Sequence, residues 1–150
     1  MIVGRVCSRV VATASSHETI RVAAQRMAAM DVGALVVLEA ADGGRPIGVV
    51  TDRDIVLRCM AVCLDPDQTE IGGIMTDQVH SVDEEDSVED ALEQMAKAGT
   101  RRLVVLGGRG RLAGILSLDD ALDVMAEEAG AVRRVLGSQH HQMTSGFSLR

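Results

Sequence analysis

Apolar positions along the chain follow two spacings, and each spacing predicts one kind of element. Over residues 19–31 and 87–99, apolar side chains lie three and four positions apart, which places them on one face of a helix. The uninterrupted apolar runs at 34–38 and 102–106 predict buried strands. The positions on the two helical faces are Ile20, Ala23, Ala24 and Met27 in the first helix, and Val88, Ala91, Leu92 and Met95 in the second.

The same order of elements occurs twice, as strand, helix, strand, strand, helix (β-α-β-β-α). VGRVCSRVVATA at 3–14 aligns with IGGIMTDQVHSV at 71–82, and GVVTDRD at 48–54 aligns with GILSLDD at 114–120. Several matches in one order indicate an internal repeat. The other predicted elements of the two units are first strands near 10–14 and 78–82, last strands at 46–50 and 112–116, and last helices at 52–63 and 118–128.

The repeat predicts an α/β (α+β) fold in which the two units pack sheet to sheet around a pseudo-two-fold axis. A unit of about 60 residues buries too little surface to be secure alone, so we expect one domain built from both. Repeat 1 is expected at 1–63, a linker at 64–70 and repeat 2 at 71–128. The helical pattern fades after 128, and we expect 129–150 to be a mobile tail.

Composition narrows the possible partners. Apolar residues make up 47% of the chain, enough for a core, but there is one Phe and no Trp or Tyr to stack on nucleic-acid bases. The net charge of −7 also argues against a nucleic-acid partner. We expect no membrane partner, because no apolar run is long enough to span a bilayer. Cys7, Cys59 and Cys63 cannot all pair, which favours a reducing cytoplasm.

The repeated corner Thr51-x-x-Asp54 and Ser117-x-x-Asp120 has two interpretations, which can both hold. A hydroxyl followed three positions later by an acid resembles a capping box, which satisfies backbone N–H groups at the start of a helix. The same helix start also favours a phosphate, and the carboxylate can accept hydrogen bonds from the vicinal hydroxyls of a ribose. Two such corners around an axis would flank a shared cleft.

The tandem β-α-β-β-α units, each with Gly-h-h-[Thr/Ser]-x-x-Asp, resemble the cystathionine β-synthase (CBS) domain pair, or Bateman module, over residues 1–128. The resemblance implies a stand-alone, bacterial-type regulatory protein. It would bind an adenosine-containing ligand (AMP, ADP, ATP or S-adenosylmethionine) between the repeats and signal to an unidentified partner protein. The alternative is an unliganded, stress-related interaction protein, in which the corners are only helix caps.

The resemblance also implies the ligand-binding residues. The hydroxyl of each corner would meet phosphate, and each Asp the ribose. Arg101 and Arg102 match the family's phosphate-binding position in repeat 2, whereas Gly33 and Ala34 stand there in repeat 1, so the two clefts are not equivalent. We expect the larger effect at Asp120, unless these arginines cross to the neighbouring cleft. The implied ligand-binding residues are Thr51, Asp54, Arg53, Thr13 and Ala14, and Ser117, Asp120, Ser81, Val82, Arg101 and Arg102; for Arg53, a solvated surface side chain is the competing interpretation.

The remaining sequence motifs do not predict a further chemical function. GRGRLA at 108–113 leads into a strand, so we interpret it as a hairpin turn and not a dinucleotide fingerprint. No nucleophile or metal-ligand pattern appears, so we expect neither an enzyme, nor a metal site, nor a required cofactor. The outward face of 118–128 carries more apolar residues than one core face needs, which predicts an interface; the resemblance to CBS domain pairs implies that this interface forms a homodimer. That face comprises Leu118, Leu122, Val124, Met125 and Ala126.

Overall fold

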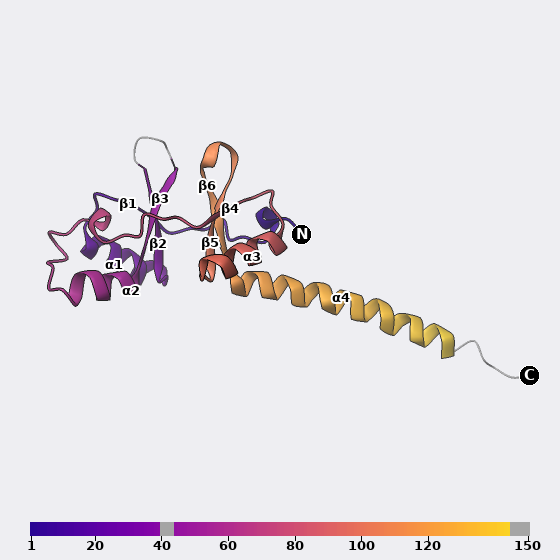
Figure 1. The fold of residues 1–150 in the computed structure, drawn as a ribbon. Coiled ribbons are helices and arrows are strands. Elements are labelled where there is room, and N and C mark those ends of the chain that lie inside the picture. Colours follow the sequence, from indigo (N-terminus) through magenta and orange to yellow (C-terminus); the bar gives the residue numbers. More distant parts are fainter. Residues whose placement is uncertain (40–43, 145–150) are drawn as a thin grey trace, which may run out of the picture.

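The computed structural model describes residues 1–39 and 44–144, with side chains as far as residue 137. Two lobes lie side by side, and a long helix runs out from the second (Figure 1). The first lobe contains β1 (Thr13–Ser15), α1 (Ile20–Met30), β2 (Ala34–Leu38), β3 (Pro46–Thr51) and α2 (Asp52–Ile55). The second contains β4 (Ser81–Asp83), α3 (Val88–Ala98), β5 (Arg102–Leu106), β6 (Leu112–Ser117) and α4 (Leu118–Thr144).

Each lobe has a three-stranded sheet, in the order β1-β2-β3 and β4-β5-β6. The outer strand β1 pairs parallel with β2, and β3 pairs antiparallel with β2; the second sheet repeats both relations. Even the registers correspond, because Ala34 lies opposite Thr51 and Arg102 lies opposite Ser117. The predicted α/β fold of two β-α-β-β-α repeats is therefore confirmed.

Local sequence explains where α1 and α3 begin and end. The Thr19 hydroxyl accepts a hydrogen bond from the Val22 amide (3.4 Å), and the Ser87 hydroxyl accepts one from the Asp90 amide (3.0 Å). Both are side-chain caps of a helix N-terminus. Each helix ends at a residue in the left-handed conformation; Gly99 does so without steric penalty.

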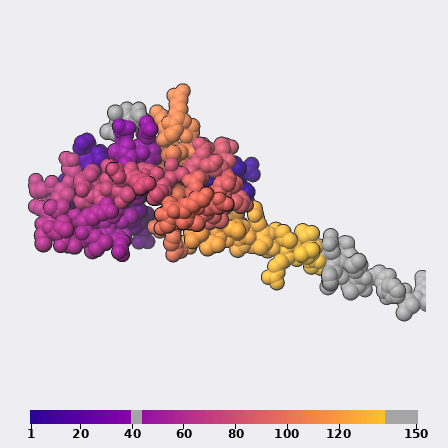
Figure 2. Space-filling view, in the orientation of Figure 1, coloured from indigo at the N-terminus to yellow at the C-terminus, as the bar shows by residue number. Residues whose placement is uncertain are grey.

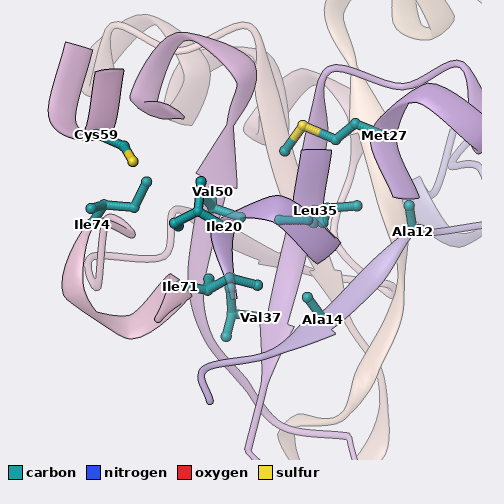
Figure 3. Packing of buried hydrophobic residues seen from close by; sticks show 11 residues of the cluster. Ala12, Ala14, Ile20, Met27, Leu35, Val37, Val50, Cys59, Ile71 and Ile74 are labelled. Atoms are coloured by element: carbon teal, nitrogen blue, oxygen red, sulfur yellow. The ribbon is translucent and has the colours of Figure 1, made fainter. Parts of the chain in front are cut away.

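The segment that leads into each repeat packs on the other repeat. Val3 and Cys7, from the start of the chain, belong to the core of the second lobe. Ile71 and Ile74 belong to the core of the first lobe, where Figure 3 shows them among first-repeat side chains such as Val37 and Val50. Backbone hydrogen bonds fix the exchange: the Val3 amide donates to the Asp86 carbonyl and the Ile71 amide to the Glu18 carbonyl, both at 2.9 Å. Each lobe therefore includes a segment from the other repeat, so the boundaries of the lobes differ from those of the sequence repeats.

The glycine that opens each repeated motif lies beneath an exchanged segment. A Cβ at Gly48 would be 2.6 Å from Met75 Sδ and 3.0 Å from the Thr76 carbonyl oxygen. A Cβ at Gly114 would be 2.7 Å from the Ser8 carbonyl oxygen and 2.8 Å from Cys7 Sγ. Only a residue without a side chain lets the lead-in segment approach this closely. These glycines thus serve the exchange of segments and not a turn.

Two helices differ from their predicted bounds. The helix expected over 52–63 is one α-helical turn, α2, followed by a π-helical turn η2 (Val56–Met60), because the Ala61 amide bonds the Val56 carbonyl, five residues back, at 2.8 Å. The helix expected over 118–128 continues to Thr144 as α4, through the segment expected to be a mobile tail. Residues 145–150 of that segment lie outside the described residues. Within the described part of the chain, no helix has the length and apolarity needed to cross a membrane.

Candidate functional site

A cleft of about 230 Å³ lies between the two repeats, and we call it the first cleft. Its apolar wall comes from both sheets, with Val49 on β3 and Leu103, Val104 and Ile115 on the second sheet. Its polar groups also come from both repeats, so a molecule in the cleft would contact both. They are Thr51, Asp54, Thr76, Gln78, His80, Thr100 and Arg102.

The Thr51–Asp54 corner of this cleft is a complete capping box. The Thr51 amide donates to Asp54 Oδ2 (3.0 Å), and the Asp54 amide donates to Thr51 Oγ1 (3.1 Å). The cap uses one acceptor position of the carboxylate, which has about four. Asp54 Oδ1 lies 3.6 Å from Arg58 Nε, and the Asp54 side chain retains 16% exposure. The corner is therefore a helix cap that still has acceptor positions for a ligand.

Arg102 crosses from the second repeat to the first cleft. It begins β5 and lies opposite Ser117, yet it lines the same cleft as Thr51 and Asp54. Within the described part of the chain, its guanidinium makes no hydrogen bond or ion pair. Its counterpart in the first repeat, Ala34, is apolar and also lines this cleft. Among the described residues, the structure thus brings one arginine without a side-chain partner to the meeting point of the two repeats.

The pseudo-symmetric second cleft has different chemistry. One part, of about 240 Å³, is formed by Val10, Val11, Ala12 and Val32 together with Asp31, Gly33 and Ala34, and it also reaches Arg102 and Ile115. An adjoining hollow is lined by Arg101, Arg102, Ser117 and Asp119. Where the first cleft has Thr76, Gln78, His80 and Thr100, the second has mostly aliphatic side chains. It therefore has fewer hydrogen-bonding groups for a polar ligand.

The Ser117–Asp120 corner is also a complete capping box. The Ser117 amide and hydroxyl both donate to Asp120 Oδ2, at 3.1 and 2.6 Å, and the Asp120 amide donates to Ser117 Oγ at 3.1 Å. The serine hydroxyl proton is thus already engaged by the neighbouring carboxylate. Arg101 Nη2 lies 3.3 Å from Asp119 Oδ1, so this arginine is partly neutralised, unlike Arg102.

The other residues that the sequence suggested lie away from the first cleft. Ala14 and Val82 are buried in the two cores, at 6% and 3% exposure, and Ser81 begins β4. Thr13 lines a separate open hollow beside Glu18 and Arg26. Arg53 is exposed on the first turn of α2.

That outer hollow contains an ion pair with a structural role. The Arg26 guanidinium donates to both Glu18 carboxylate oxygens (2.6 and 2.8 Å) and to the Thr13 carbonyl (2.8 Å). These hydrogen bonds hold the pKa of Glu18 below its usual value. The pair ties α1 to β1, so its charges are satisfied within the first repeat.

Several residues of the first cleft were not predicted from the sequence. Thr76, Gln78 and His80 precede β4 and reach the first cleft because their segment crosses to β3, where Thr76 and Val49 exchange two backbone hydrogen bonds of 2.9 Å. Arg58 lies above the corner; its Nη1 donates to the Ile74 carbonyl (2.9 Å) and to Thr76 Oγ1 (3.3 Å). The spacing of Arg58, one helical turn beyond Asp54, was a signal in the sequence that could have found it.

The first cleft combines groups that are suited to binding a small polar molecule. No group of three or more His, Cys, Asp or Glu side chains able to hold a metal ion occurs among the described residues. Burial raises the pKa of the Cys7 thiol, and Cys59 is fully buried, which suits packing in the two cores and not metal ligation. What the first cleft offers is an acceptor, a cation and an apolar wall within one small space.

Comparison with protein families gives the same pattern twice. The model of the CBS domain matches residues 3–61 and again residues 71–127. An uncharacterized protein of Methanopyrus kandleri is 34% identical over 122 residues, which cover 81% of this chain. The match covers 61% of that longer protein. Hypoxic response protein 1 of Mycobacterium tuberculosis is 36% identical over 113 residues, which cover 75% of this chain and 77% of the relative.

Solved structures agree with the sequence relatives. A CBS domain protein of Pyrobaculum aerophilum complexed with AMP has a TM-score of 0.72 at 31% identity, and covers 80% of this chain and 89% of its own. Hypoxic Response Protein I, solved with two coordinated zinc ions, has a TM-score of 0.73 at 32% identity, and covers 82% of this chain and 98% of its own. The described residues of the present chain, as noted above, lack a ligand cluster for such an ion.

Proposed function

This chain belongs to the CBS-domain family, and on that premise we propose that it is a regulatory module that binds an adenosine-containing mononucleotide in the first cleft. The observation that carries the proposal is that Asp54 of one repeat and the unpaired Arg102 of the other line the same cleft. A ribose hydroxyl needs an acceptor and a phosphate needs a cation. A nucleotide supplies both groups within one molecule.

Each part of a nucleotide has a matching group in the first cleft. The Asp54 carboxylate can accept hydrogen bonds from the ribose diol without releasing Thr51, since one lone pair is enough for the cap. Arg102 can donate two parallel hydrogen bonds to a phosphate. The base would lie against the apolar wall of Val49 and Ile115. Thr76 and His80 are then positioned to contribute further polar contacts.

The size of the first cleft favours a mononucleotide. Small-molecule sites usually have volumes of about 300–1,000 Å³, and this cleft, at about 230 Å³, lies just below that range. A dinucleotide would extend well beyond it. The likeness to the P. aerophilum protein complexed with AMP supports the same class of ligand. The second cleft, with its aliphatic lining, is proposed as the weaker site or as a site that stays empty.

A ligand could regulate the protein because the cleft contains residues from both repeats. A ligand held by Asp54 and Arg102 bridges the two repeats, so it stabilises whichever relative placement of the repeats brings these groups together. A partner protein that contacts both repeats would detect the change. We also propose that the protein is not an enzyme and that it is located in the cytoplasm, as the sequence suggested.

Self-association is part of the proposal. Val56, Leu57 and Met60, on the turns after β3, are 49–59% exposed, and Leu122 and Met125, at the equivalent place in the second repeat, are 51% and 47% exposed. Apolar side chains gathered at equivalent positions of both repeats suit an interface between two copies. A homodimer would cover them.

Thermal denaturation with a panel of AMP, ADP, ATP and S-adenosylmethionine tests the ligand. A ligand at 100 times its dissociation constant adds about 2.7 kcal/mol to the free energy of unfolding. That raises the melting temperature by roughly 2–4 °C per kcal/mol for a chain of this size. Inosine monophosphate is the control for recognition of the adenine base. If no member of the panel moves the melting temperature, the corners are helix caps alone and the unliganded interaction protein becomes the better account.

A further inference from the structure

The distal part of α4 extends outward from the body of the protein. Figure 1 shows the helix passing beneath the second lobe and continuing outward, and Figure 2 shows the same segment protruding as an arm. Ala121 is fully buried, but from Ala126 to Gly137 every side chain that the structure describes, Gly130 apart, is exposed. We call residues 122–136 the arm. None of its residues belongs to either of the two core clusters of the described chain.

The arm carries an apolar stripe with a strict spacing of three and four. In a heptad, where the seam residues take positions a and d, Leu122, Ala129 and Leu136 fall at a, and Met125 and Val132 fall at d. Exposure of the four large residues ranges from 47% at Met125 to 59% at Val132. The stripe therefore follows the spacing of a coiled-coil seam, and no element among the described residues covers it.

The opposite side of the arm is polar. Asp123, Glu127 and Arg134 line a shallow surface there, together with Gly130. An apolar stripe with charges on the opposite face is what an amphipathic helix presents to one partner. A protruding helix interrupted by Gly130 and Gly137 also has little stability of its own in water. Burial of the stripe would supply that stability.

We propose that the arm forms a parallel, two-stranded coiled coil with the arm of a second copy of this chain. The charges beside the seam select this partner and this direction. Glu128 occupies position g and Arg133 position e of the following heptad, so in a parallel pair Glu128 of each copy faces Arg133 of the other. Both pairs form at once because of the two-fold symmetry.

An antiparallel pair of arms would lose this match. There, position g faces position g of the other helix, and the g positions are Ala121, Glu128 and Val135. None of them is a cation, so Glu128 would face an apolar residue or its own copy. The same holds at e, where Arg133 would face Ala126, Asp119 or itself, and only the distant Asp119 is an acid. The parallel pair is the arrangement that joins both charges at the centre of the stripe.

The direction has a consequence for the dimer proposed above, on which this inference rests. Parallel arms begin side by side at Leu122, so the second repeats of the two copies must be neighbours. The first clefts of the two copies are then related by the two-fold axis and lie at equal distances from it. The arm thereby fixes the orientation of the dimer, which the apolar patch at Val56 and Met60 alone leaves open.

Disulfide trapping tests the register directly. In a Cys63→Ser background, which removes the one exposed native thiol, Met125→Cys and Val132→Cys should each form covalent dimers under mild oxidation. In a parallel pair, every seam residue faces its own copy. In an antiparallel pair, at most one position along the arm can do so. Glu127→Cys, on the polar face, is the matched control and should stay monomeric on a non-reducing gel.

Charge exchange tests the pairing. Glu128→Arg and Arg133→Glu should each weaken the dimer about tenfold in sedimentation velocity, because each places like charges opposite one another in both pairs. The double variant should recover the wild-type dissociation constant. Glu127→Arg changes the same charge outside the seam and should leave it unchanged.

The outcomes separate this inference from the proposed function. Covalent dimers at both 125 and 132, with recovery in the double variant, support the parallel arm. A dimer that forms without either cross-link overturns the arm but keeps the proposed dimer, and a chain that is monomeric at tens of micromolar overturns both. Nucleotide binding is measured separately by calorimetry on the Cys63→Ser chain, so its failure would count against the nucleotide and not against the arm.

Discussion

Arg102 of the second repeat lines the same cleft as Asp54 of the first. The two residues are 48 positions apart in sequence; Arg102 begins β5, and Asp54 lies within the helical turn α2. Their meeting makes the first cleft a site shared by both repeats. The counterpart of Arg102 is Ala34, so the first repeat contributes no equivalent cation; Arg102 also reaches the second cleft, and the two clefts differ mainly in their other polar groups.

Removal of Arg102 should weaken nucleotide binding more than removal of its neighbour. We expect Arg102→Ala to lower the affinity for AMP by about 10- to 150-fold, the loss that corresponds to roughly 1.5–3 kcal/mol of charge-assisted hydrogen bonds. Arg101→Ala is the matched control, since Arg101 is 73% exposed and pairs with Asp119 outside the first cleft. Titration calorimetry measures both. Equal losses in the two variants would contradict the assignment of the phosphate to Arg102.

The two corner carboxylates should differ in their effect on binding. Asp54→Asn replaces one ribose acceptor with a donor, and we expect a loss of about 10-fold or more in affinity. Asp120→Asn should have the smaller effect, because the second cleft has fewer polar groups than the first to hold a nucleotide. Without ligand, both variants should unfold within about 1 kcal/mol of wild type, because the amide oxygen of Asn can still accept the hydrogen bond from the Thr51 or Ser117 amide.

This order reverses the one expected from the sequence, because Arg102 does cross to the neighbouring cleft. Calorimetry with AMP on both variants decides it. A larger loss at Asp120 would transfer the main site to the second cleft, and unfolding by more than about 2 kcal/mol in either variant would mean that the carboxylate is chiefly structural.

The motif glycine should be needed for folding and not for ligand contact. Gly114→Ala would bring a Cβ to 2.7 Å from the Ser8 carbonyl oxygen, a backbone atom that cannot swing aside, so we expect a loss of about 1–3 kcal/mol in the free energy of unfolding. Gly73→Ala is the control, because a Cβ there meets no atom within 4 Å. Urea denaturation of both variants gives the comparison. A wild-type midpoint for Gly114→Ala would mean that the lead-in segment at Ser8 can move away at no cost.

Acid should weaken the first repeat through Glu18. Its pKa is lowered by hydrogen bonds from Arg26, so the folded state binds this proton less readily than the unfolded state. The resulting stability is present above the unfolded pKa of a glutamic acid, about 4.3, and is lost as the pH falls through the lower, folded value. The pair is about a third exposed, so we expect no more than about 1 kcal/mol.

Glu18→Gln therefore should destabilise the protein at pH 7 and make little difference at pH 3, measured by urea denaturation at both values. Glu85→Gln, an exposed glutamate, is the control and should have no effect at either pH. A loss for Glu18→Gln that is the same at pH 3 as at pH 7 would assign its role to packing and not to charge.

The sequence by itself determined the features that repeat within a few residues. The three-and-four spacing of α1 and α3, the apolar runs of β2 and β5, and both capping boxes were all predicted, because each depends on neighbours along one element. The internal repeat also implied the pseudo-symmetric pair of sheets. The arm was not predicted: the helix was expected to stop near 128, because the glycines and polar residues beyond it obscure the three-and-four spacing from Leu122 to Leu136.

Only the tertiary structure decided which repeat each lead-in segment joins. Val3 and Ile71 occupy equivalent positions and are both fully buried, so either side chain fits either core by size and polarity. The exchange carries Thr76, Gln78 and His80 into the first cleft and leaves aliphatic residues in the second. The packing of the two sheets likewise places Arg102 in the same cleft as Asp54. Periodicity reports which face of an element is buried, but contacts between elements depend on the path of the chain through space, and no local spacing encodes that path.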